Sequence, residues 1–164
     1  MTNQTRLLFG KPVSLSINEQ LKSEVELLAE QGIIPGLAVV LVGEDPASNV
    51  YVKSKSKAFS KLNCFSKTYR LPASVPEPEL LSLIDQLNSD PTFHGILVQL
   101  PLPSHFDSGN ITRRINPEKD VDGFHPLNLG YLLEGDPVFI PCTPNGILKM
   151  LEYYKIETSG KNVV

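Results

Sequence analysis

Leu37-Ala38-Val39-Val40-Leu41-Val42 is the most informative stretch for the fold, because it is apolar throughout and ends at Gly43. A strand with one wet face alternates polar and apolar residues, whereas a strand buried on both faces does not. The run therefore predicts a central strand of a parallel sheet. Gly95-Ile96-Leu97-Val98-Gln99-Leu100 is a second run of this kind. We expect the two runs to pair in parallel, as neighbours or near neighbours.

Helical patterns flank both runs. Apolar residues recur at helical spacing over residues 13–31, with Gly32 as a C-cap. Asp45-Pro46 is typical of an N-cap and first helical residue, and that helix should reach about Leu62. The other expected elements are a weaker strand at 65–71 and helices at 77–87, 111–115, 127–133 and, opened by Thr143-Pro144, 143–154. Alternating strands and helices predict an α/β fold, a three-layer α/β/α sandwich with a mostly parallel sheet.

The overall composition indicates an ordinary globular protein. The 164 residues are 41% hydrophobic and 20% charged, which suits one domain, and the formal net charge of −3 offers no attraction for nucleic acid or an anionic membrane. No run has the length and hydropathy of a membrane span or secretory signal. With only Cys64 and Cys142, we expect a reducing cytoplasm, and Cys142 buried and structural. His94, His105 and His125 lack metal-ligand spacing, so no metal is expected.

One lysine of the second predicted helix falls on its apolar side. With Tyr51 at zero on a helical wheel of about 100° per residue, Lys55 lies at about 40°. The same stripe contains Ala47, Ala58 and Leu62. Desolvation lowers the pKa of a lysine and makes it a base or nucleophile near neutral pH. The alternative is that Lys55 extends past the stripe to solvent and that Tyr51 is a core residue.

Gln99 is polar where the preceding residues of its strand are apolar. Ligands of open α/β sheets bind at the carboxyl ends of strands, and the helix with Tyr51 and Lys55 follows the first buried strand. We therefore expect Tyr51, Lys55 and Gln99 to face one cleft. A glutamine can accept from an ammonium or donate to a free amine, without holding the charged form as a carboxylate would.

Four motifs together resemble one enzyme family. They are Val42-Gly43-Glu44-Asp45-Pro46-Ala47-Ser48 followed by Tyr51-Val52-Lys53-Ser54-Lys55, Gly95-Ile96-Leu97-Val98-Gln99-Leu100-Pro101-Leu102-Pro103, Pro117-Glu118-Lys119-Asp120-Val121-Asp122-Gly123-Phe124, and Pro141-Cys142-Thr143-Pro144. They occur in order and span essentially the whole chain. The sequence resembles the N-terminal catalytic domain of the bifunctional methylenetetrahydrofolate dehydrogenase/methenyltetrahydrofolate cyclohydrolase family.

The resemblance implies two reactions of one-carbon folate metabolism. NADP oxidises 5,10-methylenetetrahydrofolate to the methenyl cation, and water then opens this cation to 10-formyltetrahydrofolate. Lys55 would be the main catalytic residue, with Tyr51 shaping the folate site and Gln99 tuning the proton affinity of Lys55. Asp122 would bind the pterin ring, because one carboxylate can accept two parallel hydrogen bonds. The substrate-binding residues implied by the resemblance are Tyr51, Asp122, Leu100 and Pro101.

The resemblance also implies an organisation for the chain. Residues 1–142 would form the folate-binding catalytic domain, 143–158 a linking helix, and 159–164 the start of a truncated NADP-binding domain. The sequence holds no GxGxxG motif, so we expect the NADP site and the dehydrogenase activity only in a full-length protein. That protein would be a cytoplasmic enzyme of purine biosynthesis and a homodimer.

Other interpretations remain open. Short-chain dehydrogenases also use Tyr-x-x-x-Lys, but residues 43–48 lack the glycines that precede their motif. A non-catalytic folate-binding fragment, in which Lys55 only pairs with substrate charge, is the main alternative. A structural or assembly piece that binds no folate is the third.

Overall fold

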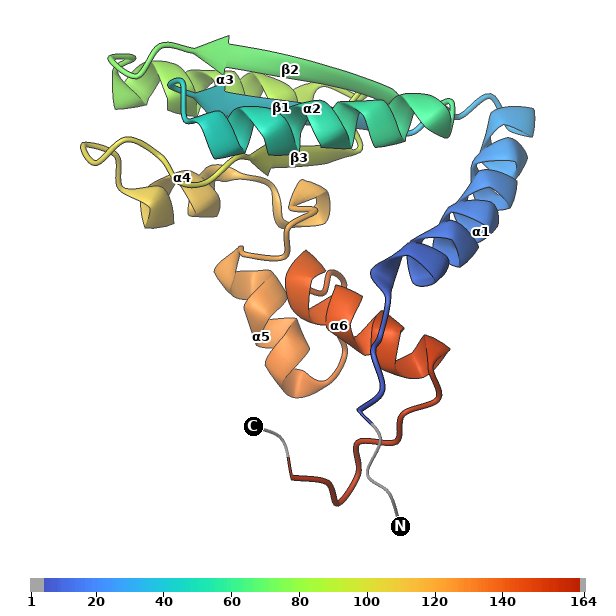
Figure 1. The fold of residues 1–164 in the computed structure, drawn as a ribbon. Helices are drawn as coiled ribbons and strands as arrows, with labels where there is room; N and C mark the ends of the chain where they lie inside the picture. Colours follow the sequence, from blue (N-terminus) through green and yellow to red (C-terminus); the bar gives the residue numbers. More distant parts are fainter. Residues whose placement is uncertain (1–4, 163–164) are drawn as a thin grey trace.

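The computed structural model describes residues 5–162 and contains a three-stranded parallel sheet with helices on both faces (Figure 1). In chain order the elements are α1 (Gly10–Glu30), β1 (Gly36–Val42), α2 (Pro46–Lys61), β2 (Phe65–Leu71), α3 (Glu77–Ser89), β3 (Gly95–Val98), α4 (Ser108–Arg114), the short 3-10 helix η1 (Pro117–Lys119), α5 (Pro126–Glu134) and α6 (Cys142–Tyr153). None of the helices within residues 5–162 combines the length and the hydropathy needed to span a membrane.

β1 lies at the centre of the sheet, in the strand order β2-β1-β3. All seven of its residues are buried, as expected for a strand that is apolar on both faces. Its parallel pairing with β3 runs from Leu37 opposite Gly95 to Val40 opposite Val98. The predicted parallel pairing of the two apolar runs is confirmed.

Alternate residues of β1 enter two separate cores. On one face of the sheet, Val39 and the other β1 residues that point to this face pack with Val52 of α2. Val40 and its neighbours on the other face pack with α3 and α4, through residues that include Ile84 and Ile111. Figure 1 shows α2 on one side of the sheet and α3 on the other. The predicted three-layer α/β/α sandwich is confirmed.

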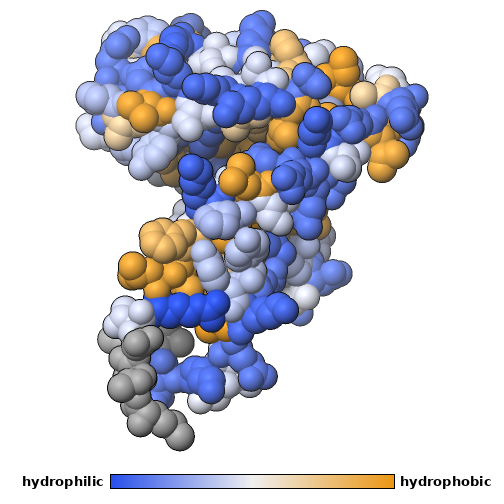
Figure 2. Space-filling model, turned by 45° about the vertical axis from the view of Figure 1, so that its right-hand side comes forward, coloured by the Kyte–Doolittle hydropathy of each residue, from blue (hydrophilic) through white to orange (hydrophobic). Residues whose placement is uncertain are grey.

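The helices α1, α5 and α6 lie beyond the sheet (Figure 1). The Tyr154 hydroxyl, directly after α6, donates to the Phe9 carbonyl at 3.0 Å and accepts from the Phe9 N–H at 3.1 Å, so the two ends of the described chain are joined. In Figure 2 one group of hydrophobic residues lies on the lower part of the molecule, where Figure 1 places α5 and α6, and others lie on the upper part. Exposed apolar side chains of this part include Leu127, Leu133, Val138, Ile147 and Leu148.

Three sequence-based boundaries are corrected. β3 ends at Val98 rather than residue 100, because the chain turns into Pro101, which has no N–H for a ladder. α1 begins at Gly10 rather than residue 13. α6 begins at Cys142 with Pro141 as its N-cap, so Thr143 is not the cap, and Pro144 lies in the first turn, where its missing N–H is tolerated.

The last predicted segment, 159–164, is only partly described. Residues 159–162 form a turn and coil rather than a strand, and residues 163–164 lie outside the described range. The division into 1–142, 143–158 and 159–164 therefore stays a prediction.

Candidate active site

The turn between β1 and α2 determines where α2 starts. Gly43 has a φ of +82°, a region that favours glycine. The Asp45 carboxylate accepts a hydrogen bond from the Ser48 N–H at 2.7 Å, and Pro46 follows at the first helical position. Backbone and side-chain hydrogen bonds from Ser48 to this carboxylate lower the pKa of Asp45. The predicted N-cap and helix start are confirmed.

The buried face of α2 is rotated relative to the predicted stripe. Ser48 and Val52 are buried, whereas Tyr51 is 61% exposed and Ala47 and Ala58 are also exposed. The wheel centred on Tyr51 is therefore wrong, because contact with the sheet selects the Val52 side of the helix. Lys55, one turn after Val52, is half-buried at the border of the contact face.

Lys55 and Gln99 meet at the carboxyl end of the sheet. The Lys55 Nζ donates to the Gln99 Oε1 at 3.3 Å. The Gln99 Nε2 donates to the Leu100 carbonyl at 2.7 Å, which orients the amide because a carbonyl can only accept. The Gln99 backbone N–H also donates to the Val40 carbonyl at 2.9 Å, which keeps the residue on the sheet. The amide oxygen is thus presented to the amine by two further hydrogen bonds.

The segment after η1 brings a carboxylate to the same region. Asp122 is half-buried, and burial raises the pKa of its carboxyl group. The Lys55 charge opposes this rise in the pKa of Asp122, and the Asp120 charge adds to it. Two sequence-distant side chains, Lys55 and Asp122, therefore lie within electrostatic range of each other.

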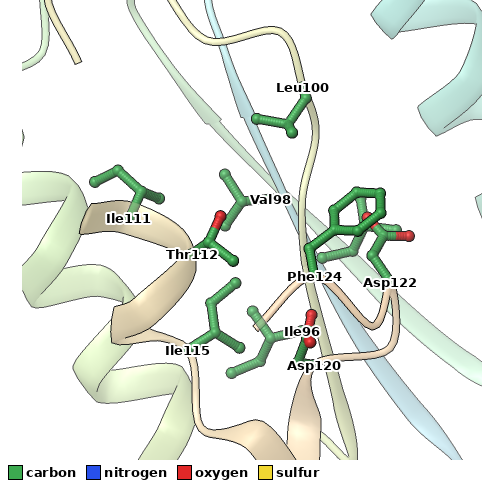
Figure 3. Close-up of a pocket in the computed structure, with 10 residues that line it drawn as sticks. Ile96, Val98, Leu100, Ile111, Thr112, Ile115, Asp120, Asp122 and Phe124 are labelled. Carbon is green, nitrogen blue, oxygen red and sulfur yellow. The ribbon is translucent and has the colours of Figure 1, made fainter. Parts of the chain in front are cut away.

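Asp122 borders a narrow crevice beside β3 (Figure 3). Figure 3 shows Ile111, Thr112 and Ile115 on the α4 side of the crevice and Asp120, Asp122 and Phe124 on the other side. Leu100 also lines the crevice, with Ile96 and Val98 of β3. The crevice has a volume of about 10 Å³, far too small for a heterocycle, so it shows only that Asp122 lies beside apolar packing.

The predicted site residues are only partly brought together. The structure places Lys55, Gln99, Asp122 and Leu100 around the end of β3. Tyr51 is exposed on α2, and Pro101 is exposed on the loop after β3. Neither Tyr51 nor Pro101 takes part in the contacts that join the other four site residues.

Sequence reasoning missed Asp120 and Asn128, which are the most buried polar side chains near the site, at 2% and 1% exposure. The signals were an additional aspartate two residues before Asp122 and a single asparagine between Leu127 and Leu129 of an apolar helix. A buried polar residue in such a position needs specific hydrogen-bond partners.

Cys142 is exposed rather than buried, which corrects the expectation of a core cysteine. Its Sγ lies 3.7 Å from the Val121 carbonyl. Partial burial of the thiol and then the Asp122 charge raise the pKa of Cys142, so the start of α6 does not activate it.

The strand ends of the described sheet do not fit the phosphates of NADP. Such phosphates need free backbone N–H groups at a glycine-rich turn before a helix. The start of α2 is occupied by the Asp45 carboxylate, and the first turn of α3 carries Glu77 and Glu79. β3 runs into Leu100-Pro101 instead of a glycine-rich turn.

The family description "Tetrahydrofolate dehydrogenase/cyclohydrolase, catalytic domain" matches residues 8–122. The chain belongs to this family. It is 54% identical over 158 residues to the bifunctional protein FolD of Halalkalibacterium halodurans, covering 96% of this chain and 57% of that protein. The FolD of Bacillus subtilis is 52% identical over 158 residues, with coverages of 96% and 56%. The chain thus spans little more than half the length of these relatives.

Solved structures of the family have the same fold. The FolD methylenetetrahydrofolate dehydrogenase/cyclohydrolase of Campylobacter jejuni matches with a TM-score of 0.89 and 49% identity, over 92% of this chain and 54% of that one. The Trypanosoma brucei FolD, solved with NADP cofactor and inhibitor, matches with a TM-score of 0.91 and 34% identity, over 96% of this chain and 54% of that one.

Proposed function

We propose that this chain supplies the folate-binding and catalytic part of a methylenetetrahydrofolate dehydrogenase/methenyltetrahydrofolate cyclohydrolase, with Lys55 as its main catalytic residue. The observation that supports this most is the Lys55–Gln99 hydrogen bond of 3.3 Å beside Asp122, in a chain of this family. The three side chains come from separate segments and have complementary chemistry: a proton carrier, a neutral partner that orients it, and an acceptor of paired hydrogen bonds.

The water-addition step follows from these groups. Water adds to the methenyl carbon and loses one proton to the Lys55 amine, which acts as a general base in this proposal. The bond from this carbon to N5 then breaks, the formyl group stays on N10, and the second water proton goes to N5. One proton is released overall. Gln99 would hold the amine in place in either protonation state, because its amide carries no charge.

Asp122 would hold the pterin end of the substrate. An ionised carboxylate accepts parallel hydrogen bonds from a ring N–H and the neighbouring amino group. Leu100, which is exposed after β3, would contact the ring, and the exposed Tyr51 would pack against the substrate from α2. Pro101 would extend the Leu100 wall.

The oxidation step belongs to a longer protein in this proposal. Hydride transfer needs the nicotinamide carbon about 3–3.5 Å from the methylene carbon of the folate. The described strand ends do not fit NADP phosphates, so we propose that residues outside this chain bind NADP. Assembly as a homodimer, a cytoplasmic location and a contribution to purine biosynthesis remain predictions for that longer protein.

The test is to follow both reactions separately on the purified 164-residue chain. We expect binding of methenyltetrahydrofolate and slow, enzyme-dependent loss of its absorbance, with no NADPH formed from methylenetetrahydrofolate at any NADP concentration. Binding without any turnover would instead favour the non-catalytic folate-binding module. Absence of folate binding would refute the proposal, and NADP-dependent oxidation would show that the account of the cofactor is wrong.

A further inference from the structure

Asp120 is a carboxylate buried in the protein without a cation in contact. It is 2% exposed, and the described residues contain no salt bridge to it. Its Oδ2 accepts from the His125 backbone N–H at 2.8 Å and from the Asn128 Nδ2 at 2.9 Å. Burying a carboxylate is costly, and hydrogen bonds such as the two to Oδ2 offset part of this cost.

Asn128 completes the arrangement from α5. Its Nδ2 donates both to Asp120 and to the Pro117 carbonyl at 2.9 Å, so both of its N–H groups are used. The amide therefore joins two residues that precede Asp122, Pro117 and Asp120, to α5. No other orientation of this amide satisfies both acceptors.

The same turn is attached to the sheet and bent sharply. Asp120 forms a parallel bridge with Ile96 of β3. The Gly123 N–H donates to the Asp120 carbonyl at 3.1 Å, and Gly123 has a φ of +68°. A Cβ at Gly123 would meet the Pro141 nitrogen at 3.2 Å, so the turn is also packed against the start of α6. Asp122 lies inside this bend, with its neighbours on both sides held.

We propose that Asp120 and Asn128 form a buried positioning pair that holds the Asp122 carboxylate beside the Lys55 amine. The pair does not touch the reacting atoms. It acts through the backbone of the turn, which has no strand or helix of its own to fix it. The consequence for folate binding rests on the function proposed above, whereas the positioning itself does not.

The pKa of Asp122 reports on this positioning, because it depends on the distance between Asp122 and the Lys55 charge. The groups facing Asp122 are Lys55 from α2, Asp120 from its own turn and Cys142 from α6. Lys55 lowers the pKa of Asp122, so removing the amine by Lys55→Met should raise that pKa. The size of the rise reports how close the two groups are held.

The experiment compares this rise in three backgrounds, by carboxyl 13C NMR titration of Asp122 without any ligand. The backgrounds are the wild-type chain, Asn128→Ala, and Asn88→Ala as matched control. Asn88 also ties loop backbone, through the Arg114 carbonyl at 2.8 Å and the Asn116 N–H at 2.8 Å, and it lies outside the candidate site. We expect Lys55→Met to raise the pKa of Asp122 equally in wild type and Asn88→Ala, and much less in Asn128→Ala.

Folate affinity is the second measurement. Asn128→Ala should weaken binding of methenyltetrahydrofolate about tenfold, the equivalent of losing one well-placed hydrogen bond, while Asn88→Ala should not. An undiminished rise in Asn128→Ala, or unchanged affinity, would overturn the positioning pair. If Asn128→Ala does not fold, Asn128→Ser takes its place with the same expected outcomes. Failure of the wild-type chain to bind folate would instead count against the proposed function, since the NMR comparison uses no ligand.

Discussion

The Lys55 Nζ on α2 and the Gln99 Oε1 after β3 are 3.3 Å apart, although 44 positions separate them in the chain. The contact crosses the carboxyl end of the sheet, where β1 leads into α2 and β3 leads into the Leu100 loop. The Gln99 Nε2 donates to the Leu100 carbonyl, so the Gln99 Oε1 faces the Lys55 amine. A lysine held in this way can pass a proton without changing its position.

Lys55→Met tests the central role of the amine. The change keeps an apolar stem of similar length, so we expect the thermal unfolding midpoint to stay close to wild type. Cyclohydrolase turnover should fall by at least about 100-fold, the usual contribution of a positioned general base. Lys53→Met is the matched control, because Lys53 is exposed on the same helix. Normal turnover in Lys55→Met would show that another group carries the proton.

Gln99→Glu tests why the partner of Lys55 is neutral. A carboxylate at this position would form a charge-assisted hydrogen bond with the ammonium and hold the amine in its charged form. We expect turnover at neutral pH to fall by about tenfold or more, because such a bond contributes roughly 1.5–3 kcal/mol, and to recover as the pH is raised. A pH–rate profile measures this, and an unshifted profile would contradict it.

Asp122 should couple folate affinity to pH. In the proposed function the ionised carboxylate of Asp122 holds the pterin, and burial raises the pKa of this group. Affinity should therefore be lost as the pH falls through this raised pKa, at a higher pH than for an ordinary aspartate. Isothermal titration across the acidic range measures the midpoint. Affinity that stays constant down to the pKa of a solvent-exposed aspartate would contradict the assignment.

The same raised pKa has a consequence for stability. Because burial raises the pKa of Asp122 in the folded protein, ionisation of this group costs stability above its folded pKa and costs nothing below its unfolded pKa. Asp122→Asn should therefore raise the unfolding temperature at neutral pH while abolishing tight folate binding. The gain should disappear in acid, which thermal scans at both pH values would show.

Gly36→Ala tests the packing at the start of β1. A Cβ there would collide with the Thr92 backbone carbonyl, which has no side-chain freedom to move away. We expect a loss of about 1–3 kcal/mol in the free energy of unfolding, as for other overpacked cores. Gly130→Ala is the control, since nothing lies within 4 Å of its added Cβ in α5, and it should stabilise by about 0.5–1 kcal/mol. Denaturant titrations of both variants provide the comparison.

The sequence by itself determined the sheet and the start of α2. Continuous apolar runs can only be satisfied by burial on both faces, which is why residues 37–42 and the first four residues of 95–100 form adjacent parallel strands. Asp45-Pro46 fixed the start of α2 because capping is a contact between near neighbours in the chain. These features depend on interactions within a few residues or on hydropathy alone.

Only the tertiary structure decided which side of α2 faces the sheet and which polar residues are buried. Tyr51 and Val52 are both plausible centres of an apolar stripe, and packing against the sheet chooses Val52. The approach of Asp122 to Lys55 and the pairing of Asp120 with Asn128 likewise depend on how η1, α5 and β3 come together. Such contacts join segments whose separation in the chain sets no distance in space, so local patterns can suggest a buried polar residue but do not specify its partner.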